Sequence, residues 1–503
     1  MLNTVFRGRL SELMEEVRKG KIGTELQGTH TRPCKFWTAL KVLSGVRNSI
    51  VIAHGPRGCA YGVKRAYKLT NCRNSGTPYE AVVSTNMDVR QIVYGGEKEL
   101  RGAILEVDRK YKPDVIFVAT SCASGIIGDN VDAVVKAAQS EVRAELVAVH
   151  CEGFSGEYRS GFDLAFEKLV ELMEEPTPQS REELSDSVNI VGGRMGPERT
   201  EVDTDVKELI RLVRGMGAKV NAVIAGYCTL EELRRAPSVA VNCTRCLEFG
   251  YAIGMKMLEK FGTPLNSTIL PYGIAATERW IKGAAEHLGM EEKAERLMEE
   301  EYDRVKTEFE RAKENLEGMS AIVEGHDAVR ALAIAHMLEI DFGMDVVIYN
   351  FHPWSTKAKR TSIDYVLETG MDPEIVITEG TITFGKYESM KQLEEELLSL
   401  LELDGEKDVV YFGSSLSFPS VPLVDLNAIL NRPRFGYRGA LRIAKCINTA
   451  FKRFRALKAL NRPLRSRLFR EMVYPRDSST VGCANLALKM ACEVPDPTIY
   501  ARR

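Results

Sequence analysis

Short apolar runs alternate with longer amphipathic stretches along residues 31–185. The runs Asn48–Ala53 and Asp114–Ala119 are rich in β-branched residues, which is typical of buried strands. The stretches between such runs have the pattern of helices. An alternation of strand and helix predicts a parallel sheet with helices on both faces. We also expect a strand over Glu145–His150 and helices over Glu97–Tyr111, Val131–Ser140 and Gly161–Glu175.

The same alternation follows twice more along the chain. A stretch rich in proline, serine and glutamate, Pro176–Ser187, predicts a linker after the first unit. Residues 186–319 then form a second α/β unit and residues 320–450 a third. The expected strands of these two units are Val188–Val191, Lys219–Ala225, Val239–Asn242, Leu265–Ile269, Ala321–Glu324, Asp345–Asn350, Pro373–Thr378, Val409–Gly413 and Val421–Asp425.

The two ends of the chain and one charged stretch depart from this pattern. Residues 1–30 contain a short amphipathic helix, Leu10–Lys19, and are predicted to form an arm that lies on a partner. The many Glu–Lys and Glu–Arg neighbours in Glu291–Glu317 predict a long solvated helix. Residues 451–503 begin with a basic, helix-forming segment, Lys452–Arg470. This segment is either a docking face or an ordinary amphipathic surface helix.

Length and composition limit the class of protein. A chain of 503 residues is too long for a single core, which predicts several domains. A formal net charge of −2 gives no attraction toward nucleic acid or anionic membranes, so we expect neither as a partner. Without a signal-peptide pattern or 18 consecutive apolar residues, we expect a cytoplasmic protein. Eleven cysteines then indicate reduced thiols or metal ligands rather than disulfides.

Three cysteines of the first unit lie in or beside loops: Cys34, Cys59 and Cys122. The last two come just past the ends of predicted strands, where open α/β sheets bind ligands. Thiolates there suit a soft metal, above all iron with sulfide. Glycines such as Gly58 would let backbone N–H groups approach the cluster sulfurs. The alternative for each cysteine taken alone is a small buried apolar side chain.

These cysteines belong to a series of motifs that resembles the nitrogenase component 1 family, in the family's order and at close to its intervals. The resemblance is to the D/E-type, α-like subunits and covers about residues 30–450. It implies an α/β fold of three doubly wound parallel-sheet domains with a cofactor cleft between them. The motifs are Cys34, His54-Gly-Pro-Arg-Gly-Cys59, Tyr94-Gly-Gly-Glu-Lys-Glu-Leu100, Ser121-Cys122 with Ile127-Gly-Asp129, and Cys151-Glu-Gly-Phe154.

The resemblance also implies partners and cofactors. In this family an α-like and a β-like subunit share an iron–sulfur cluster at their interface. Cys34, Cys59 and Cys122 would be this chain's ligands to an eight-iron, P-cluster-like cluster or to a four-iron cluster, within an α2β2 heterotetramer. Electrons would come from a separate ATP-dependent iron–sulfur reductase, because this chain has no Gly-x-x-x-x-Gly-Lys-Ser/Thr loop with which to bind ATP.

A second complex iron–sulfur cofactor is also implied. In α-like subunits of the family, a cysteine at the start of the helix ahead of a Gly-x-Pro turn binds that cofactor. Here Gly262-Thr-Pro264 ends a predicted helix that Cys246 begins, so Cys246 is the matching residue. Catalytic subunits and E-type assembly scaffolds both carry such a cysteine. Cys243 and Cys246 also form a single Cys-x-x-Cys pair, a weak zinc or redox signal, and the alternative for Cys246 is a buried thiol.

The histidines depart from the nitrogenase pattern. The family's imidazole ligand precedes its final glycine-rich turn, but Val424–Gly439 contains no histidine. The family's histidine after Cys-Glu-Gly-Phe is also missing, and its place falls near Gly161–Asp163. His352 is the best remaining imidazole for a cofactor ligand or proton donor, and the alternative is a hydrogen-bonded loop histidine. Asp129 most simply caps the helix expected near Asn130.

Cationic side chains near the family motifs are candidates for holding an anionic cofactor or a carboxylated substrate. Lys64 and Arg65 are predicted to bind the cofactor, and Arg159 is predicted to act in catalysis. Most such charges will lie on the surface. The wider set also includes Arg57, Lys357, Arg360 and Arg438.

Three functions fit the sequence. The first is the catalytic α-like subunit of a nitrogenase-like reductase, with reductive C–S cleavage of methylthio-alkanes as the leading specific reaction. The second is an E-type scaffold on which a cofactor precursor matures. The third, dinitrogen reduction, is least favoured because the missing histidines remove a ligand and a proton donor. A tetrapyrrole reductase of the same superfamily would have a shorter chain. We prefer the first function to the second.

Overall fold

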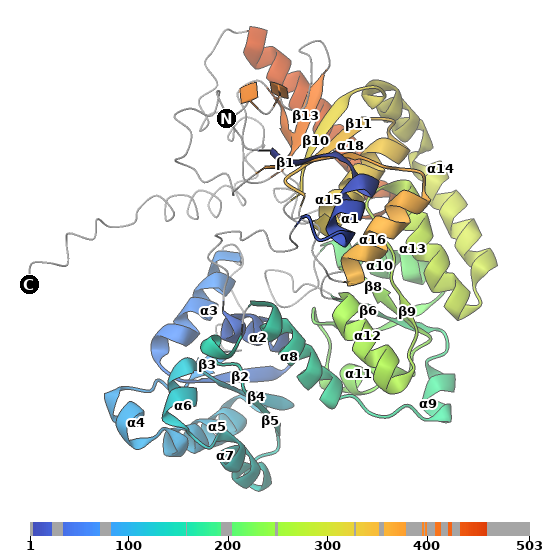
Figure 1. Ribbon diagram of the computed structural model, residues 1–503. Helices are drawn as coiled ribbons and strands as arrows, with labels where there is room; N and C mark the ends of the chain where they lie inside the picture. The colour runs from blue at the N-terminus through green and yellow to red at the C-terminus, as the bar shows by residue number, and fades with distance from the viewer. Residues whose placement is uncertain are drawn as a thin grey trace, which may run out of the picture.

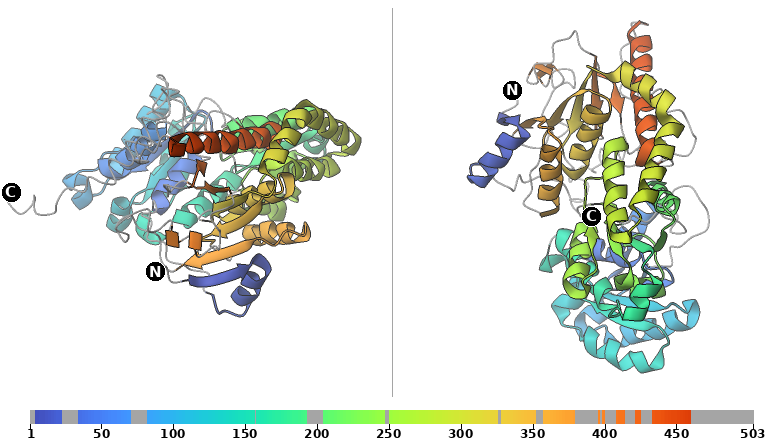
Figure 2. Two further views of the ribbon diagram at one scale, coloured as in Figure 1. Left: turned by 90° about the horizontal axis from the view of Figure 1, so that it is seen from above. Right: turned by 90° about the vertical axis from the view of Figure 1, so that its right-hand side faces the viewer.

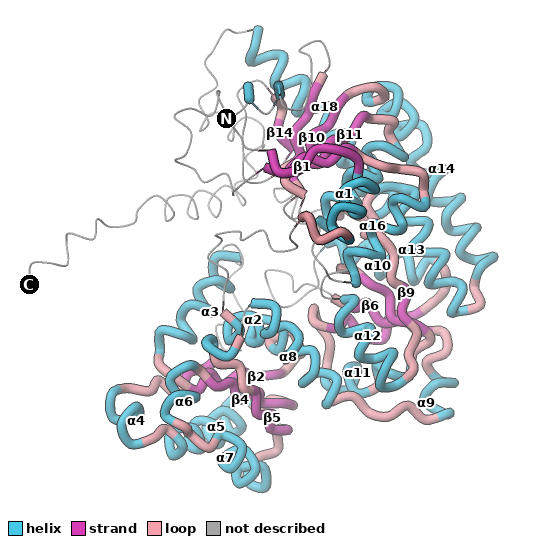
Figure 3. The backbone as a smooth tube through the Cα atoms, in the orientation of Figure 1, coloured by secondary structure: helices cyan, strands magenta, loops and turns pink. Residues whose placement is uncertain are grey.

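The computed structural model describes a molecule built on three mainly parallel sheets flanked by helices (Figures 1 and 3). Only the backbone is described at 64–70, 357–361 and 456–459. None of the described helices is both long enough and apolar enough to cross a membrane. The described residues are 4–22, 34–70, 82–156, 158–192, 204–246, 250–325, 328–351, 357–378, 395–396, 398–399, 408–413, 421–424 and 433–459.

The first sheet has the strand order β3–β2–β4–β5 and is parallel throughout. Every residue of β2 and β4 is buried, because helices cover both faces. Ile50 and Ile52 pack on one side against Ile104, whereas Val51 and Ala53 belong to the core on the other side. The strands are β2 (Ser49–His54), β3 (Val82–Ser84), β4 (Val115–Thr120) and β5 (Glu145–Val149).

The helices of this unit follow the predicted alternation. The helix predicted over Glu97–Tyr111 has those bounds in the structure. The one predicted over Val131–Ser140 ends as an α-helix at Ala138 and continues as a 3-10 turn. The helices are α2 (Lys35–Leu43), α3 (Arg57–Thr70), α4 (Val89–Tyr94), α5 (Glu97–Tyr111), α6 (Cys122–Ile127), α7 (Val131–Ala138), η2 (Gln139–Glu141), η3 (Gly153–Ser155) and α8 (Tyr158–Glu171).

The second sheet has the order β7–β6–β8–β9 and is also parallel. Part of the predicted linker Pro176–Ser187 is a short helix, α9 (Pro178–Glu183), whose first turn is capped by the side chain of Thr177. The remaining elements are β6 (Ser187–Val191), α10 (Thr204–Gly215), β7 (Lys219–Ile224), α11 (Leu230–Arg234), η4 (Ala236–Ser238), β8 (Val241–Thr244), α12 (Gly250–Phe261), β9 (Leu265–Asn266), α13 (Gly273–Leu288) and α14 (Glu291–Leu316).

The third sheet has the order β1–β12–β11–β10–β13–β14. Its strands are parallel except for β1. The boundary expected at residue 450 falls inside its last helix, α18. The elements are β10 (Ser320–Glu324), α15 (Ala328–His336), η5 (Met337–Asp341), β11 (Asp345–Tyr349), α16 (Lys357–Glu368), β12 (Glu374–Thr378), β13 (Val409–Phe412), β14 (Leu423–Val424) and α18 (Gly436–Ala459).

The N-terminal segment, expected as an arm on a partner, completes this chain's own third sheet. Strand β1 (Thr4–Arg9) pairs antiparallel with β12, beside which it lies in Figure 2. The following helix, α1 (Leu10–Arg18), buries Leu10 and Leu13 completely. An uncovered edge strand presents unpaired backbone groups, and β1 satisfies those of β12. The sequence pattern of residues 4–9 gives no hint of this partner, which lies more than 360 residues away.

The long charged helix predicted over Glu291–Glu317 is present as α14, but only part of its surface is solvated. One of its faces, which includes Leu297, Phe309 and Leu316, is buried in the core. That face also carries Glu301, whose carboxylate lies 2.6 Å from the guanidinium of Arg211. The frequent charges in the sequence obscure this apolar stripe, which is recognisable only as a spacing of three and four residues.

The strand order of each sheet reverses once. The reversal lies between β2 and β4 in the first sheet, between β6 and β8 in the second, and between β10 and β13 in the third. These are the topological switch points of doubly wound sheets, where the loops after neighbouring strands diverge and leave room for a ligand. The predicted α/β class and doubly wound architecture are therefore confirmed.

A buried histidine in the third unit provides a pH test of this packing. His336 is 1% exposed, its ring lies tilted against that of Tyr365 with the centroids 5.4 Å apart, and neither ring nitrogen has a hydrogen-bond partner within the described part of the chain. Burial lowers the pKa of His336 to about 4. The unfolded chain binds a proton at about pH 6.5, so stability should fall by up to ~3 kcal/mol between pH 6.5 and pH 4.

Urea denaturation of the wild type and of His336→Phe at pH 7 and pH 4.5 measures this contribution. The phenyl ring keeps the packing and cannot be protonated, so we expect the variant to lose less stability on acidification. Equal losses in the two proteins would assign the acid sensitivity to other groups.

Candidate functional site

Cys59 and Cys122 lie together at the switch point of the first sheet. Strands β2 and β4 run in register, with His54 opposite Thr120 at their carboxyl ends. The chain then turns into α3, which carries Cys59 in its first turn, and into α6, which begins at Cys122. The structure therefore brings these two predicted ligands to one edge of the sheet, where backbone N–H groups of the helix starts favour negative charge.

Cys34 reaches the same place from a different element. It is the N-cap residue of α2. A Cβ atom built on Gly153 would lie 3.2 Å from Sγ of Cys122 and 3.4 Å from Sγ of Cys34. The two sulfurs thus face one point above the backbone of Gly153. We call this point, which is clear of side-chain atoms because residue 153 is a glycine, the hollow above Gly153; thiols at its border are the ligand type that a sulfide-bridged iron cluster requires.

The three thiols are open to the surroundings. Cys34 and Cys59 are exposed, and Cys122 is partly exposed. Burial raises the pKa of the Cys59 thiol, and negative charge on Cys122 and Cys34 raises it further. Three mutually repelling thiolates need a positive centre among them. Among the described residues, no group of three His, Cys, Asp or Glu side chains is arranged to hold a single metal ion.

The neighbouring Cys151 has a different environment. It is completely buried, its Sγ contacts the carbonyl oxygen of Thr120 at 3.5 Å, and burial strongly raises its pKa. The next residue, Glu152, accepts a 2.5 Å hydrogen bond from the Thr120 hydroxyl. The carboxylate of Glu152 therefore holds the turn that carries Gly153, while Cys151 is packed in the core.

Gly153 is the part of the site that cysteine spacing did not reveal. In Gly153→Ala the new methyl group would press on Cys34 and Cys122, and at 3.2–3.4 Å one of the sulfurs must shift by a few tenths of an ångström. We expect the variant to fold but to bind iron about tenfold more weakly, in the range seen for residues that orient metal ligands. Iron titration with absorption spectroscopy measures the loss.

Gly62→Ala is the control for this experiment. A Cβ on Gly62, which lies in α3 together with Cys59, meets no described atom within 4 Å. Unchanged iron binding in Gly153→Ala would mean that no cluster occupies the hollow above this glycine.

His54 and Asp129 form a buried pair that the sequence analysis missed. The predicted cap role of Asp129 is wrong, because the side chain of Asn130 caps α7. Asp129 Oδ2 instead lies 2.8 Å from Nε2 of His54. Burial lowers the pKa of His54 although Asp129 opposes the change, so the imidazole is neutral at pH 7. Both residues belong to the motifs that resemble the nitrogenase component 1 family, but nothing in their spacing indicated the contact.

Cys246 occupies the switch point of the second sheet. Strand β8 ends at Thr244, which pairs with Val191 at the end of β6. Cys246 is partly exposed, and its carbonyl oxygen accepts a 2.7 Å hydrogen bond from Gly250 N at the first residue of α12. The helix predicted to begin at Cys246 is therefore described only from Gly250, with the cysteine one turn ahead of it.

A buried ionic cluster joins the Cys246 segment to the final glycine-rich turn. Asp205 in α10 accepts hydrogen bonds from the backbone N of Arg434 at 2.7 Å and from its guanidinium at 3.0 and 2.5 Å. Arg245 lies 3.5 Å from the same carboxylate. Burial opposes ionisation of Asp205, but the two arginines outweigh it and hold its pKa below the usual value. The Cys246 segment and the final glycine-rich turn, which were expected on two sides of a cofactor, therefore lie next to each other.

The structure describes the remaining predicted residues only in part. Gly58 precedes Cys59 and faces open space. Lys64 and Arg65 lie in α3, but their side chains are outside the described structure, as is His352 entirely. Arg159 lies in the first turn of α8, where its charge and that of Lys256 counteract the effect of burial on the raised pKa of Asp163. None of these roles is tested by the geometry.

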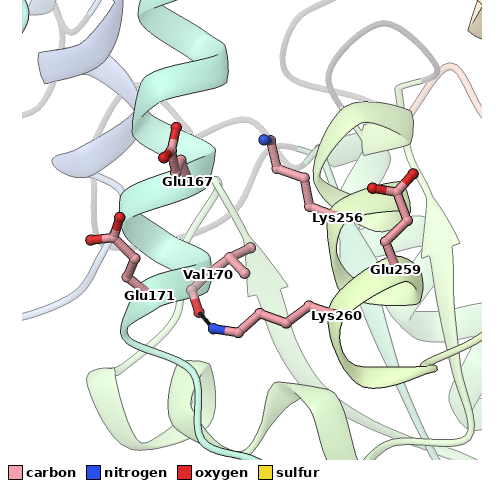
Figure 4. Close-up of a pocket in the computed structure, with 6 residues that line it drawn as sticks. All are labelled: Glu167, Val170, Glu171, Lys256, Glu259 and Lys260. Atoms are coloured by element: carbon pink, nitrogen blue, oxygen red, sulfur yellow. Dashed lines mark hydrogen bonds between the residues drawn. The ribbon is translucent and has the colours of Figure 1, made fainter.

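A shallow cavity of about 390 Å³ lies between α8 and α12 (Figure 4). The lysines reach from α12 toward α8, and Lys260 Nζ donates a 3.3 Å hydrogen bond to the carbonyl oxygen of Val170. Alternating charges partly neutralise each other here, and no thiol or imidazole lines the cavity, so it does not extend either site. Its lining residues are Glu167, Val170, Glu171, Lys256, Glu259 and Lys260.

Doubly wound sheets with thiols at two of their switch points define a class of α/β proteins suited to metal clusters. The chain belongs to the nitrogenase component 1 type oxidoreductase family, whose model matches residues 34–452. Within that family it is an α-like subunit of the D/E type. Iron–sulfur binding is a property of the family, which agrees with the thiols described above.

The similar proteins fall into two groups. The chain is 28% identical over 429 residues to the nitrogenase iron-molybdenum cofactor biosynthesis protein NifE of Methanococcus maripaludis, covering 83% of each chain. It is 25% identical over 443 residues to the nitrogenase molybdenum-iron protein alpha chain of Methanothermobacter marburgensis, covering 84% of this chain and 88% of that one. A solved nitrogenase, Cp1 at pH 5, has the same fold, with a TM-score of 0.60, 22% identity, and coverage of 86% and 91%.

Proposed function

We propose that this chain is the α-like subunit of an E-type scaffold on which an iron–sulfur cofactor precursor matures. The observation that carries the proposal is the similarity to several proteins named for cofactor biosynthesis, with which the second switch point is compatible. That switch point offers one partly exposed thiol, Cys246, and the final glycine-rich turn places Arg434, bound to Asp205, beside it. An attachment through one thiol suits a cluster that must be released.

The first switch point supports a partner subunit. Cys34, Cys59 and Cys122 form an open set of thiols; the exposed ring of Tyr61 lies on α3 with Cys59, and the exposed ring of Phe154 follows Gly153 in η3. An exposed three-thiol set is half of a cluster site, which a β-like subunit would complete in an α2β2 assembly. Reduced thiols in this number suit the cytoplasm, where we place the complex.

An apolar patch beside these thiols supports an electron-donating partner. We define the α4 patch as Val89, Ile92, Val93, Tyr94 and Ile126, all of which are exposed. Large apolar groups gathered on one surface mark an interaction site. An ATP-dependent iron–sulfur reductase seated there would lie on the same domain as the cysteine site. A bound cluster would supply stepwise one-electron transfer, while the chain's own residues fix its position.

A second candidate is a catalytic subunit that reduces a substrate other than dinitrogen, such as a methylthio-alkane. The observation in its favour is similarity to nitrogenase alpha chains along nearly the same length as to the biosynthesis proteins. Cys246 is compatible with both functions. Dinitrogen reduction is the least favoured, since Val424–Gly439 contains no histidine.

Iron and sulfide analysis with electron paramagnetic resonance, on the complex purified without oxygen, tests the proposal. We expect the wild type to hold iron beyond the interface clusters, and Cys246→Ala to lose that excess. Cys446→Ala, which removes a partly exposed thiol of α18 away from both switch points, should keep it. Iron that matches the interface clusters alone would contradict both the scaffold and the cofactor-based reductase.

Transfer of iron to an acceptor protein distinguishes the assembly scaffold from the catalytic subunit. A scaffold should pass its excess iron to an acceptor protein without consuming a substrate. Turnover of a methylthio-alkane with reductase and ATP, without any transfer, would establish the second candidate instead.

A further inference from the structure

The His54–Asp129 pair contacts the element that carries the α4 patch. Gly95 is the C-cap of α4, and Gly96 is the N-cap of α5. Gly96 N donates to both carboxylate oxygens of Asp129, at 3.0 and 3.1 Å. A Cβ on Gly96 would lie 2.9 Å from Cε1 of His54 and 3.0 Å from Oδ2 of Asp129. The turn at the end of α4 is therefore seated directly on the buried pair.

The same pair holds the loop after β2, which leads to Cys59. His54 is the last residue of β2, and its Nδ1 lies 3.1 Å from the hydroxyl of Thr85. That hydroxyl also accepts a 3.0 Å hydrogen bond from Gly55 N. Both side chains of the pair are almost fully buried, with 0% and 3% exposure. Water does not compete for these hydrogen bonds, so the loop keeps one position relative to the ring.

The helix that begins at Cys122 is tied to the pair as well. The carbonyl oxygen of His54 accepts hydrogen bonds from Ser121 N at 3.1 Å and from Ser124 Oγ at 2.9 Å. At the other end of α6, Asp129 N donates to the carbonyl oxygen of Ser124 at 3.2 Å. A displacement of the pair therefore moves the loops of Cys59 and Cys122 together.

We propose that His54 and Asp129 are positioning residues that couple the α4 patch to the cysteine site, so that a protein seated on the patch shifts the loops of Cys59 and Cys122. The identity of that protein, an iron–sulfur reductase, rests on the proposed function. The coupling itself rests only on the contacts of the pair. Chains of buried hydrogen bonds between rigid elements transmit such displacements because packed interiors do not yield locally.

Hydrogen exchange on the full-length protein in its purified complex tests the coupling from the patch side. In Gly96→Ala the added methyl group collides with the pair. We expect the amides of Ser121 and Gly125, some 25 residues away, to lose about tenfold in protection, equivalent to ~1.4 kcal/mol of local opening free energy. Gly102→Ala, on the same helix, is the matched control because its Cβ meets no described atom within 4 Å.

Asp129→Asn provides a second variant in case Gly96→Ala does not fold. It keeps the shape and removes the charge, and it should reduce the protection of the Gly96 and Ser121 amides together. Helix α2, which follows its N-cap residue Cys34 and packs against α8, should keep the wild-type exchange of its amides. Faster exchange confined to residues 94–98 in either variant would overturn the coupling.

Adding the reductase separates this inference from the proposed function. Slower exchange over residues 89–96 of the wild type would show docking on the α4 patch. Docking should also change the exchange of the Ser121 amide in the wild type. If Asp129→Asn still binds the reductase but no longer shows this change at Ser121, the coupling is supported. Absence of any protection over 89–96 would contradict the docking site, while the Gly96→Ala result would still decide whether the pair links the two elements.

Discussion

Cys122→Ala is expected to remove most of the iron at the subunit interface. Cys122 is the first residue of α6, and its sulfur faces the same hollow above Gly153 as the sulfur of Cys34. Loss of a ligand should cost at least as much as loss of a residue that merely orients one, about 10- to 100-fold in metal affinity. Cys59→Ala should have a similar effect. Iron analysis and electron paramagnetic resonance of the anaerobically purified complex measure it.

The buried thiol of Cys151 is the matched control. It lies in the same region but contacts the Thr120 carbonyl oxygen and is completely enclosed. Cys151→Ala should keep the wild-type iron content and spectrum. If Cys122→Ala and Cys151→Ala retain iron equally, Cys122 is not a ligand and the cluster must bind elsewhere.

Asp205→Ala is expected to destabilise the fold more than any other change considered. It would leave the guanidinium of Arg434, 6% exposed, buried without the carboxylate that it contacts in the wild type. Breaking a buried ion pair by removing one partner costs about 3–5 kcal/mol. Because the pKa of Asp205 is lower in the folded chain than in the unfolded one, this stabilisation is present at neutral pH and is lost as the pH falls below about 4. Urea denaturation at pH 7 measures the loss.

Two further variants show whether the unpaired buried charge of Arg434 causes the loss of stability in Asp205→Ala. Asp186→Ala removes a partly exposed carboxylate that pairs with the exposed Lys219 and should cost at most about 1 kcal/mol. The double variant Asp205→Leu with Arg434→Met removes both buried charges and should recover much of the stability lost in Asp205→Ala. A loss below about 1 kcal/mol in Asp205→Ala would mean that water or another side chain satisfies Arg434.

Local sequence pattern was sufficient for the elements that place the cysteines. The strands predicted over Asn48–Ala53 and Asp114–Ala119 are each offset by one residue in the structure, as Ser49–His54 and Val115–Thr120. Both are buried on both faces, so a continuous apolar run identifies them without knowledge of their partners. The order of strands and helices also predicted the α/β class, and position relative to strand ends selected Cys59 and Cys122.

Contacts between distant residues could not be predicted in this way. The charged pattern of Glu291–Glu317 concealed a buried face, and the segment Thr4–Arg9 carried no sign that it pairs with β12. Asp129 is a residue type that often caps helices and it stands just before a helix, but its carboxylate binds an imidazole 75 residues earlier. A helix cap and a buried hydrogen bond to an imidazole can use the same side chain, and only the position of the partner distinguishes them.

By itself, the sequence determined the succession of strands and helices and which cysteines follow strand ends, because these depend on hydrophobic spacing within short segments. The tertiary structure decided that the sulfurs of Cys34 and Cys122 face one hollow above Gly153 and that His54 meets Asp129. It also decided that Arg434 shares Asp205 with the residue beside Cys246. These contacts depend on the order and register in which strands pair, which joins segments far apart along the chain and is set by packing of the whole fold.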